Sequence, residues 1–339
     1  MDDQEILSRF QEVKKQAGLI FYDTHFHPHD VFGFHSAHIE HQDDLQVENN
    51  PTLLERFHYN SFSLTLLEIL FRRVPRYIQK EIKKRFKITD QEFLLKTLTD
   101  ASMDNAVLVP IYPKVSPQSL YSVLDSPRFL RLGSVNFDLE EKELERDLYS
   151  QVELYSIRGI KLHPNIQLFY PHPSLNPSVF ESKLNAVYRF AEKHKLYLLF
   201  HGGISFVPTG STFEKREYAL LKHFFSNRRS FIQDLRIPVV IAHLGVYNVR
   251  NPNLDLVLHL AKYKNVYFDT AGVNPAHIST FLKRCGIEKL LFGSDALYFN
   301  LKYNLILLLR VLYDYSASNY QENIAKVFSQ NYSNLLKNI

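Results

Sequence analysis

Eight short apolar runs recur along the chain, and longer stretches with charges at helical spacing separate most of them. Short apolar runs between charged segments are typical of strands buried in a parallel sheet with helices on its faces. In three of these units the distance from one strand end to the next is 26 residues. A repeated βα unit of this size predicts one α/β domain, residues 1–339, folded as a (β/α)8 TIM barrel. The predicted strands are Ile20–His27, Asn105–Ile111, Phe129–Phe137, Ile157–His163, Leu196–His201, Val239–His243, Val266–Ala271 and Lys289–Asp295.

The stretches between these strands predict the helices of the outer layer. An open, doubly wound sheet is the alternative arrangement, but no G-x-G-x-x-G phosphate turn follows any of the strands. A further helix, Asn319–Lys337, is expected outside the barrel. The helices predicted between strands are Leu139–Leu154, Ser178–Lys193, Phe213–Leu235, Leu254–Tyr263 and Ala276–Cys285.

The segment between the first and second strands is too long for a single helix. It has room for helices at Leu53–Phe71, Ile78–Arg85 and Gln91–Ser102. We therefore predict a helical insertion, residues 30–100, that caps the C-terminal mouth of the barrel. An elaboration with no role in the site is the alternative. The histidine-rich stretch from His29 to His41 either lines the cap or, as we expect, lies in a solvated loop.

Charge and cysteine content limit the class of protein. A net charge of +4, spread along the chain, is too weak to predict binding to nucleic acid or to an anionic membrane. Cys285 is the single cysteine, so no disulfide can form within the chain and a reducing compartment is expected. The N-terminal residues show no apolar signal segment, and Leu305–Leu309 is far shorter than the roughly 20 residues needed to cross a bilayer. We expect a soluble, cytoplasmic protein.

Two histidines at the end of the first strand have the spacing of residues that face the same side. His25 and His27 are two residues apart, so a strand would project both side chains into the barrel. Two imidazoles at that spacing can chelate one metal ion. Two unrelated histidines would show the same pattern, so this motif is weak by itself.

Three other apolar runs also stop at a side chain that can bind a metal. His201 ends the fifth strand, His243 the sixth and Asp295 the eighth. A barrel brings the carboxyl ends of all its strands to one mouth, where the active sites of this fold form. The combination therefore predicts an active site built from residues that are far apart in the sequence.

Taken in order, six short motifs resemble those of the amidohydrolase superfamily. The resemblance runs from Phe21 to about Tyr298 and is most specific for the amidohydrolase-related group (amidohydrolase 2), which contains both hydrolases and nonoxidative decarboxylases. It implies a TIM barrel and a metal-dependent reaction. The motifs are D-T-H-F-H at strand 1, G-I-K-L-H-P at strand 4, F-H-G-G at strand 5, A-H-L-G at strand 6, N-V-Y-F-D-T at strand 7 and F-G-S-D at strand 8.

The resemblance also implies roles for individual residues. His25, His27, His201 and Asp295 would bind one divalent metal, with Zn²⁺ expected and Mn²⁺ or Fe²⁺ as alternatives. Such a set leaves a position for water, from which Asp295 would take a proton and pass it to the leaving group. His243 would polarise the carbonyl under attack or contact a second metal. A hydrogen-bonded core histidine is the alternative for His243.

The fourth and seventh strands leave more than one interpretation open. Lys161 and His163 share a face of the fourth strand. Lys161 would be carbamylated and bridge two metals, bind a substrate carboxylate as a cation, or pair with a buried acid such as Asp23 or Asp269; we favour a single metal. His163 would contact the substrate or a metal ligand, or be a spectator. Asp269 would orient a ligand histidine or cap the next loop.

These residues predict an enzyme that cleaves a C–N or C–O bond of an amide, lactone or ester with a metal-bound hydroxide. Nonoxidative decarboxylation of an unsaturated or aromatic acid is the alternative, since the same ligands serve it. A metal-dependent nuclease is disfavoured because the fourth strand supplies Lys161 where a glutamate would be expected. A silent scaffold is disfavoured because no ligand is missing. The expected partner is a small-molecule substrate, and a homodimer is compatible with the sequence.

Overall fold

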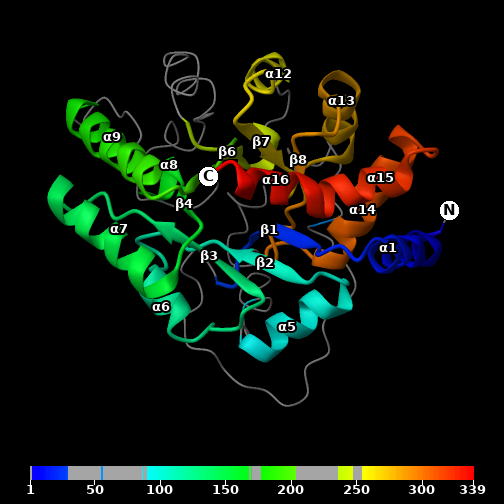
Figure 1. Ribbon diagram of the computed structural model, residues 1–339, viewed down its shortest axis with the longest axis horizontal. Helices are drawn as coiled ribbons and strands as arrows, with labels where there is room; N and C mark the ends of the chain where they lie inside the picture. The colour runs from blue at the N-terminus through cyan, green and yellow to red at the C-terminus, as the bar shows by residue number, and fades with distance from the viewer. Residues whose placement is uncertain are drawn as a thin grey trace, which may run out of the picture.

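A computed structural model describes residues 2–29, 55, 86, 90–167, 169, 177–203, 236–246 and 254–339. Eight strands form one sheet in chain order, and each neighbouring pair is parallel. Helices surround the sheet (Figure 1). The predicted (β/α)8 barrel is confirmed, and each predicted strand is present with shorter bounds. The strands are β1 (Tyr22–Phe26), β2 (Asn105–Leu108), β3 (Phe129–Ser134), β4 (Gly159–Leu162), β5 (Tyr197–Phe200), β6 (Val239–Ile241), β7 (Val266–Asp269) and β8 (Leu290–Leu291).

Backbone hydrogen bonds between β1 and the segment after β8 bring the sheet back on itself. The amide of Thr24 donates to the carbonyl oxygen of Phe292 at 2.8 Å, and the amide of Asp295 donates to that of His25 at 2.9 Å. The first strand and the end of the last strand therefore lie side by side. This closure joins two segments that carry predicted metal ligands.

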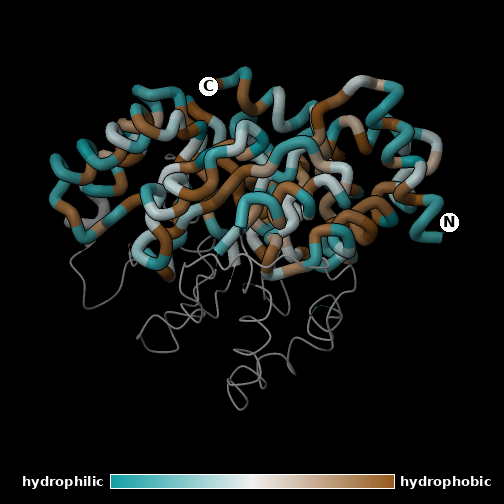
Figure 2. Tube along the Cα trace, turned by 90° about the horizontal axis from the view of Figure 1, so that it is seen from below, coloured by the Kyte–Doolittle hydropathy of each residue, from teal (hydrophilic) through white to brown (hydrophobic). Residues whose placement is uncertain are grey.

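Buried side chains follow the alternation expected along a strand. In β5, Leu198 and Phe200 pack in the layer between the sheet and the helices, whereas Tyr197 and Leu199 belong to a second cluster inside the barrel. His201 continues the inward series, two residues after Leu199. Figure 2 shows apolar segments gathered through the middle of the molecule and hydrophilic stretches along its periphery. The strands therefore have apolar side chains inside the barrel and polar side chains at their carboxyl ends, at the mouth.

The helical layer contains the predicted helices that fall within the described residues. The predictions for 139–154, 178–193, 254–263 and 276–285 are met by α7, α9, α12 and α13. The prediction Phe213–Leu235 lies outside the described residues. None of the described helices is long and apolar enough to cross a membrane. The helices are α1 (Asp3–Ala17), α5 (Gln91–Asp100), α6 (Pro117–Tyr121), α7 (Glu141–Tyr155), α8 (Pro164–Gln167), α9 (Pro177–Lys193), the 3-10 turn η3 (Ala242–Gly245), α12 (Leu254–Leu260), α13 (Pro275–Cys285), α14 (Leu301–Tyr315), α15 (Tyr320–Ala325), the π turn η4 (Lys326–Gln330) and α16 (Asn331–Lys337).

The end of the predicted insertion belongs to the covering layer. Its last helix, predicted at Gln91–Ser102, is present as α5, which packs beside α14 and buries Leu94 and Leu98. The helices predicted at 53–71, apart from Glu55, and at 78–85 lie outside the described residues. A capping role for residues 30–100 stays a prediction.

The strand and helix pattern did not predict two long helices, α1 and α14, or the short helices α6 and α8; α1 nevertheless has clear capping signals in the sequence. The side chain of Asp2 accepts a hydrogen bond from the amide of Glu5 at 2.8 Å and so starts α1. Gly18 ends it with a left-handed φ of 59°. The helix packs against α14 and against α15.

The C-terminal helix predicted at Asn319–Lys337 is divided into α15, η4 and α16. The division lies at η4, where π-type hydrogen bonding replaces the α-helical pattern. In this turn the carbonyl oxygen of Val327 accepts a hydrogen bond from the amide of Phe292 at 3.3 Å. η4 also contacts β1 and β8. The segment thus lies outside the sheet, as predicted, and helps to hold its first and last strands together.

Candidate active site

Hydrogen bonds orient the ring of His25 at the ends of the strands. Its Nδ1 lies 2.8 Å from Oδ2 of Asp269, and both side chains are fully buried. The other oxygen of Asp269 accepts from the backbone amides of His243 and Ala271, at 2.7 and 3.1 Å, which favours the carboxylate form. A carboxylate can only accept, so the proton of the His25 ring is on Nδ1 and the lone pair is on Nε2. His25 therefore presents Nε2 as a possible metal ligand.

Gly293 makes room for this ring. A Cβ atom at Gly293 would lie 2.8 Å from Cβ of His25 and 3.3 Å from the Cβ atoms of Asp269 and Ala271. Contacts below 3.0 Å require a shift of the backbone or of a rigid group. The glycine of the F-G-S-D motif is thus explained by the close approach of β8 to β1 and β7.

Three side chains converge at distances that suit a metal ion. Nε2 of His25 and Nε2 of His27 are 3.1 Å apart, and Oδ1 of Asp295 lies 3.9 Å from the first and 3.5 Å from the second. Ligand atoms bound about 2.0–2.1 Å from a tetrahedral ion stand about 3.3 Å apart. The observed separations bracket that value, and the donors are the nitrogen and oxygen types that Zn²⁺ accepts. These residues fit a metal.

Asp295 is held in an uncommon backbone conformation. Its φ is 56°, in the left-handed region that non-glycine residues seldom adopt. Ser294, the preceding residue, donates from Oγ to Oδ2 of Asp23 at 2.5 Å and from its amide to Oδ1 of Asp23 at 3.0 Å. The side chain of Asn304 donates to the carbonyl oxygen of Ser294 at 2.8 Å. These contacts hold the turn that carries Asp295 from both sides.

His243 reaches the site through a turn rather than through strand alternation. Val240 and Ala242 face the barrel interior, so a regular strand would point His243 outward. Its φ of 58° and the following Leu244 φ of 49° form a left-handed turn inside η3. The ring then lies 4.9 Å from that of His25, measured between ring centroids. His243, His25 and Asp269 form a second group whose ligand atoms lie within 4.8 Å of one another.

Lys161 brings a buried ammonium group beside His25. Its side chain is fully buried, and Nζ lies 3.3 Å from Nε2 of His25. Burial lowers the pKa of Lys161, while the charges of Asp269 and Asp295 act in the opposite direction. Within the described part of the chain no carboxylate lies within 4.0 Å of Nζ, so the predicted pairing with Asp23 or Asp269 is not a direct ion pair. The charge of Lys161 instead faces the histidine cluster.

His163 and His201 lie against each other on the other side of the site. Their rings are stacked with centroids 4.0 Å apart and planes 15° apart. His201 also has its ring centroid 4.9 Å from that of His243. Among the described residues, His201 belongs to neither close group of ligand atoms. The structure thus brings the side chains of His25, His27 and Asp295 together, whereas the ring of His201 lies beside that of His243 and outside this group.

The histidines of the site are neutral because they are buried. Burial lowers the pKa of His25, His27, His163, His201 and His243 well below the usual range. Neutral imidazoles keep the lone pair that a metal requires. Burial also raises the pKa of Asp295, and the charge of Lys161 opposes that rise. A cluster of this kind suits metal binding and proton transfer near neutral pH.

His29 is a site residue for which the sequence analysis expected a solvated loop. The side chain is buried, which contradicts that expectation for this residue, and its ring meets that of His27 edge to face at 5.9 Å. Both ring nitrogens lack a hydrogen-bond partner among the described residues. The signal that would have found it is the continued two-residue spacing of His25, His27 and His29.

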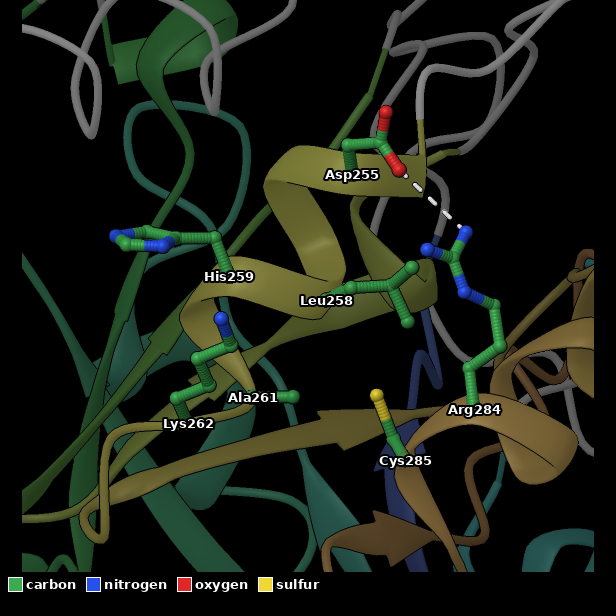
Figure 3. A pocket seen from close by; sticks show the side chains of 7 residues that line it. All are labelled: Asp255, Leu258, His259, Ala261, Lys262, Arg284 and Cys285. Carbon is green, nitrogen blue, oxygen red and sulfur yellow. Dashed lines mark hydrogen bonds and ion pairs between the residues drawn. The ribbon is translucent and has the colours of Figure 1, made fainter.

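A separate pocket lies in the helical layer, between α12 and α13, with a volume of about 540 Å³ (Figure 3). Arg284 crosses it to Asp255, with 3.4 Å between Nη1 and Oδ1. None of the strand-end residues described above lines it. The pocket is therefore distinct from the candidate active site. Its lining residues are Asp255, Leu258, His259, Ala261, Lys262, Arg284 and Cys285.

The sequence pattern of a known enzyme family covers most of this chain. The pattern described as amidohydrolase matches residues 92–331, which include seven of the eight strands, from β2 to β8. No curated protein sequence matches the chain. Residues His25 and His27 precede the matched region, and their membership of the site comes from the closure of β1 against β8.

Solved structures of this fold align with nearly the whole chain. A probable 2-pyrone-4,6-dicarboxylic acid hydrolase from Acinetobacter baumannii, with citric acid bound, has 14% identity and a TM-score of 0.52, with 94% of this chain and 99% of that chain covered. A 5-carboxyvanillate decarboxylase from Sphingomonas paucimobilis has 12% identity and a TM-score of 0.53, with 94% and 99% covered. The corresponding enzyme from Novosphingobium aromaticivorans, in complex with manganese and 4-hydroxy-3-methoxy-5-nitrobenzoic acid, has 11% identity and a TM-score of 0.54, with 94% and 96% covered. Identities this low establish a shared fold.

Proposed function

The chain belongs to the amidohydrolase family of metal-dependent enzymes, and from this premise we propose that it hydrolyses a C–N or C–O bond of a small amide, lactone or ester. The observation that carries the proposal is the convergence of His25 Nε2, His27 Nε2 and Asp295 Oδ1, with separations of 3.1, 3.5 and 3.9 Å. The site lies at the carboxyl ends of the strands, where barrel enzymes perform their chemistry.

His25, His27 and Asp295 would hold one divalent metal, and we propose His201 as the fourth ligand. Zn²⁺ suits this mixed nitrogen and oxygen set, and the manganese in the Novosphingobium aromaticivorans decarboxylase supports Mn²⁺ as an alternative. When bound, the metal would lower the pKa of a water molecule and polarise the substrate carbonyl. Asp269 would keep His25 in the tautomer that leaves Nε2 free of a proton.

The chain's own groups would manage the protons of the reaction. Water oxygen forms a bond to the carbonyl carbon, and the C–N or C–O bond to the leaving group breaks. The carboxylate of Asp295 accepts the proton that water loses and returns it to the leaving nitrogen or oxygen. The raised pKa of Asp295 suits it to both steps, because an acid that works near neutral pH gives and takes protons readily.

Nonoxidative decarboxylation of an aromatic or unsaturated acid is the second candidate function. Two observations favour it: solved structures of the same fold include 5-carboxyvanillate decarboxylases, and Lys161 places a buried ammonium group beside the site. A cation there would bind a substrate carboxylate. Release of CO₂ from 5-carboxyvanillate or 2,6-dihydroxybenzoate, without hydrolysis of any ester, lactone or amide, would favour this reaction.

Elemental mass spectrometry of the purified protein, followed by a substrate panel, tests the proposal. We expect about one equivalent of metal after reconstitution with Zn²⁺, lost in His25→Ala and retained in His194→Ala, a matched histidine change at the end of α9. The loaded protein should then hydrolyse members of a panel of amides, lactones and esters. Two equivalents would favour a carbamylated Lys161, and absence of metal in the reconstituted protein would overturn the proposal.

A further inference from the structure

We propose that His163 is a further catalytic residue whose Nε2–H donates a hydrogen bond to the substrate carbonyl oxygen, while His243 presents an acceptor in the same site. This inference rests on the proposed hydrolytic function and names the group that polarises the carbonyl under attack. It gives that role to His163 in place of His243, to which the sequence analysis assigned it.

A hydrogen bond that reaches the ring of His163 favours one of its two neutral tautomers. The backbone amide of Ile166 is shared between the carbonyl oxygen of His163, at 3.1 Å, and Nδ1 of the His163 ring, at 3.3 Å. A nitrogen that accepts an N–H carries a lone pair rather than a proton. The proton of the neutral ring is therefore on Nε2, which becomes a donor. No acceptor for Nε2 of His163 is found among the residues that the structure describes.

The ring of His243 is held in the opposite tautomer. Its Nδ1 lies 2.6 Å from the carbonyl oxygen of Ala271, and a carbonyl oxygen can only accept. The proton of the neutral ring is therefore on Nδ1, and Nε2 carries the lone pair. In this state His243 cannot donate to a substrate carbonyl. It can accept a hydrogen bond from water or from a substrate N–H or O–H group.

Contacts from two directions hold His163 in place. The side chain of Gln167 accepts from the backbone amide of His163 at 2.5 Å, and it also donates to the carbonyl oxygen of Val135 at 2.9 Å. The ring stacks on that of His201 at 4.0 Å. A donor fixed by its surroundings needs no reorganisation when charge develops on the carbonyl oxygen. His163 also shares the inward face of the strand with Lys161, whose ammonium group lies beside His25.

The chemical role requires no net proton transfer by His163. As water adds to the carbonyl carbon, negative charge grows on the carbonyl oxygen, and the hydrogen bond from Nε2–H becomes stronger. The proton stays on Nε2 throughout, and the bond weakens again when the carbonyl re-forms and the leaving group departs. Removal of one such donor typically costs roughly 10²–10³-fold in kcat.

The tautomers can be measured without a substrate. The full-length, Zn²⁺-loaded protein is labelled with ¹⁵N-histidine, and the ring signals are assigned by their loss in His163→Gln and His243→Gln. We expect the proton on Nε2 in His163 and on Nδ1 in His243. Acetohydroxamate, a small carbonyl compound that binds metals, should then shift the Nε2 signal of His163. A proton on Nδ1 of His163, or an Nε2 signal unmoved by acetohydroxamate, overturns the inference.

Two substitutions separate the donor from the structural contact. His163→Asn keeps an oxygen near the position of Nδ1 for the Ile166 amide and removes the donor, whereas His163→Gln keeps an N–H near the position of Nε2. With 4-nitrophenyl acetate as the probe, we expect His163→Asn to lower kcat by about 10²-fold with little change in KM or metal content. His163→Gln should recover part of the loss. If His163→Asn and the wild type have equal kcat, the inference is overturned. If the wild type hydrolyses no member of the panel, the result counts against the proposed function, and the NMR measurement alone decides the role of His163.

Discussion

The backbone amide of Asp295 donates a hydrogen bond of 2.9 Å to the carbonyl oxygen of His25. It is one of several backbone hydrogen bonds that join the first strand to β8 and the segment after it, and it connects two proposed metal ligands directly. It also helps to hold Asp295 at its left-handed φ of 56°. The backbone contacts that close the barrel therefore also bring these two ligands together.

Metal loading should stabilise the folded protein through these ligands. A ligand that binds only the folded state adds about 2.7 kcal/mol when its concentration is 100 times Kd. We expect Zn²⁺ to raise the Tm measured by calorimetry and a chelator to reverse the rise. In His25→Ala the rise should disappear, while His194→Ala should keep it. An identical rise in His25→Ala would show that the metal binds elsewhere.

Gly293→Ala should damage the site more than it damages the fold. The added Cβ would lie 2.8 Å from that of His25, so the ring or the β8 backbone must move. We expect a loss of about 1–3 kcal/mol in unfolding free energy, together with weaker Zn²⁺ binding in a chelator competition.

Gly18→Ala is the matched control for this glycine change. Its φ is 59° and a Cβ there meets nothing within 4 Å, so the change strains the backbone at the end of α1 without a clash. It should cost about 1–2 kcal/mol in stability and leave Zn²⁺ affinity unchanged. Equal Zn²⁺ affinity in the Gly293 variant and the wild type would remove the proposed link between this glycine and the orientation of His25.

Ser294→Ala tests whether the turn before Asp295 positions the carboxylate. The change removes the hydroxyl that donates to Oδ2 of Asp23, a fully buried group. We expect a cost of about 1–3 kcal/mol in unfolding free energy and a loss of about 10–100-fold in Zn²⁺ affinity. Ser150→Ala on α7, whose exposed hydroxyl donates to the carbonyl oxygen of Arg146 at 3.0 Å, should change neither. Unchanged Zn²⁺ affinity in Ser294→Ala would mean that the turn holds without the hydroxyl.

Buried tyrosines predict unfolding at alkaline pH. Burial raises the pKa of Tyr121, Tyr197 and Tyr332 above the usual range. A raised folded-state pKa means that this stability is present below the unfolded pKa of about 10 and is lost as the pH rises above it. Tyrosinate absorbance and circular dichroism should therefore change together above about pH 10. The chain contains no tryptophan, so the absorbance change reports tyrosine alone.

The prediction would be contradicted if the tyrosines ionised without unfolding of the protein. If all 20 tyrosines ionised near their usual pKa while the circular dichroism stayed constant, the buried hydroxyl groups would not limit stability. The hydrogen bond of 3.2 Å between the hydroxyls of Tyr197 and Tyr332 offers a second check. Tyr332→Phe should shift the alkaline transition more than Tyr149→Phe, because Tyr149 is exposed on α7.

The barrel and part of its site were legible in the sequence because they follow from local patterns. Short apolar runs specify strands, and a closed parallel sheet brings every strand end to one mouth, whichever residues lie between. The two-residue spacing of His25 and His27 was enough to place both on the inner face. The same spacing would have included His29, had the strand been extended beyond His27.

Contacts between distant residues decided the rest. Alternation would have pointed His243 outward, and only a left-handed turn anchored by Asp269 brings its ring to the site. The tautomers of His25, His163 and His243 depend on partners supplied by other parts of the chain or by the following turn. The spacing of residues along one strand cannot predict these hydrogen-bond partners, because the partners are brought close only when the chain is folded. The sequence by itself determined which residues arrive at the mouth, and the tertiary structure decided which atoms they present there.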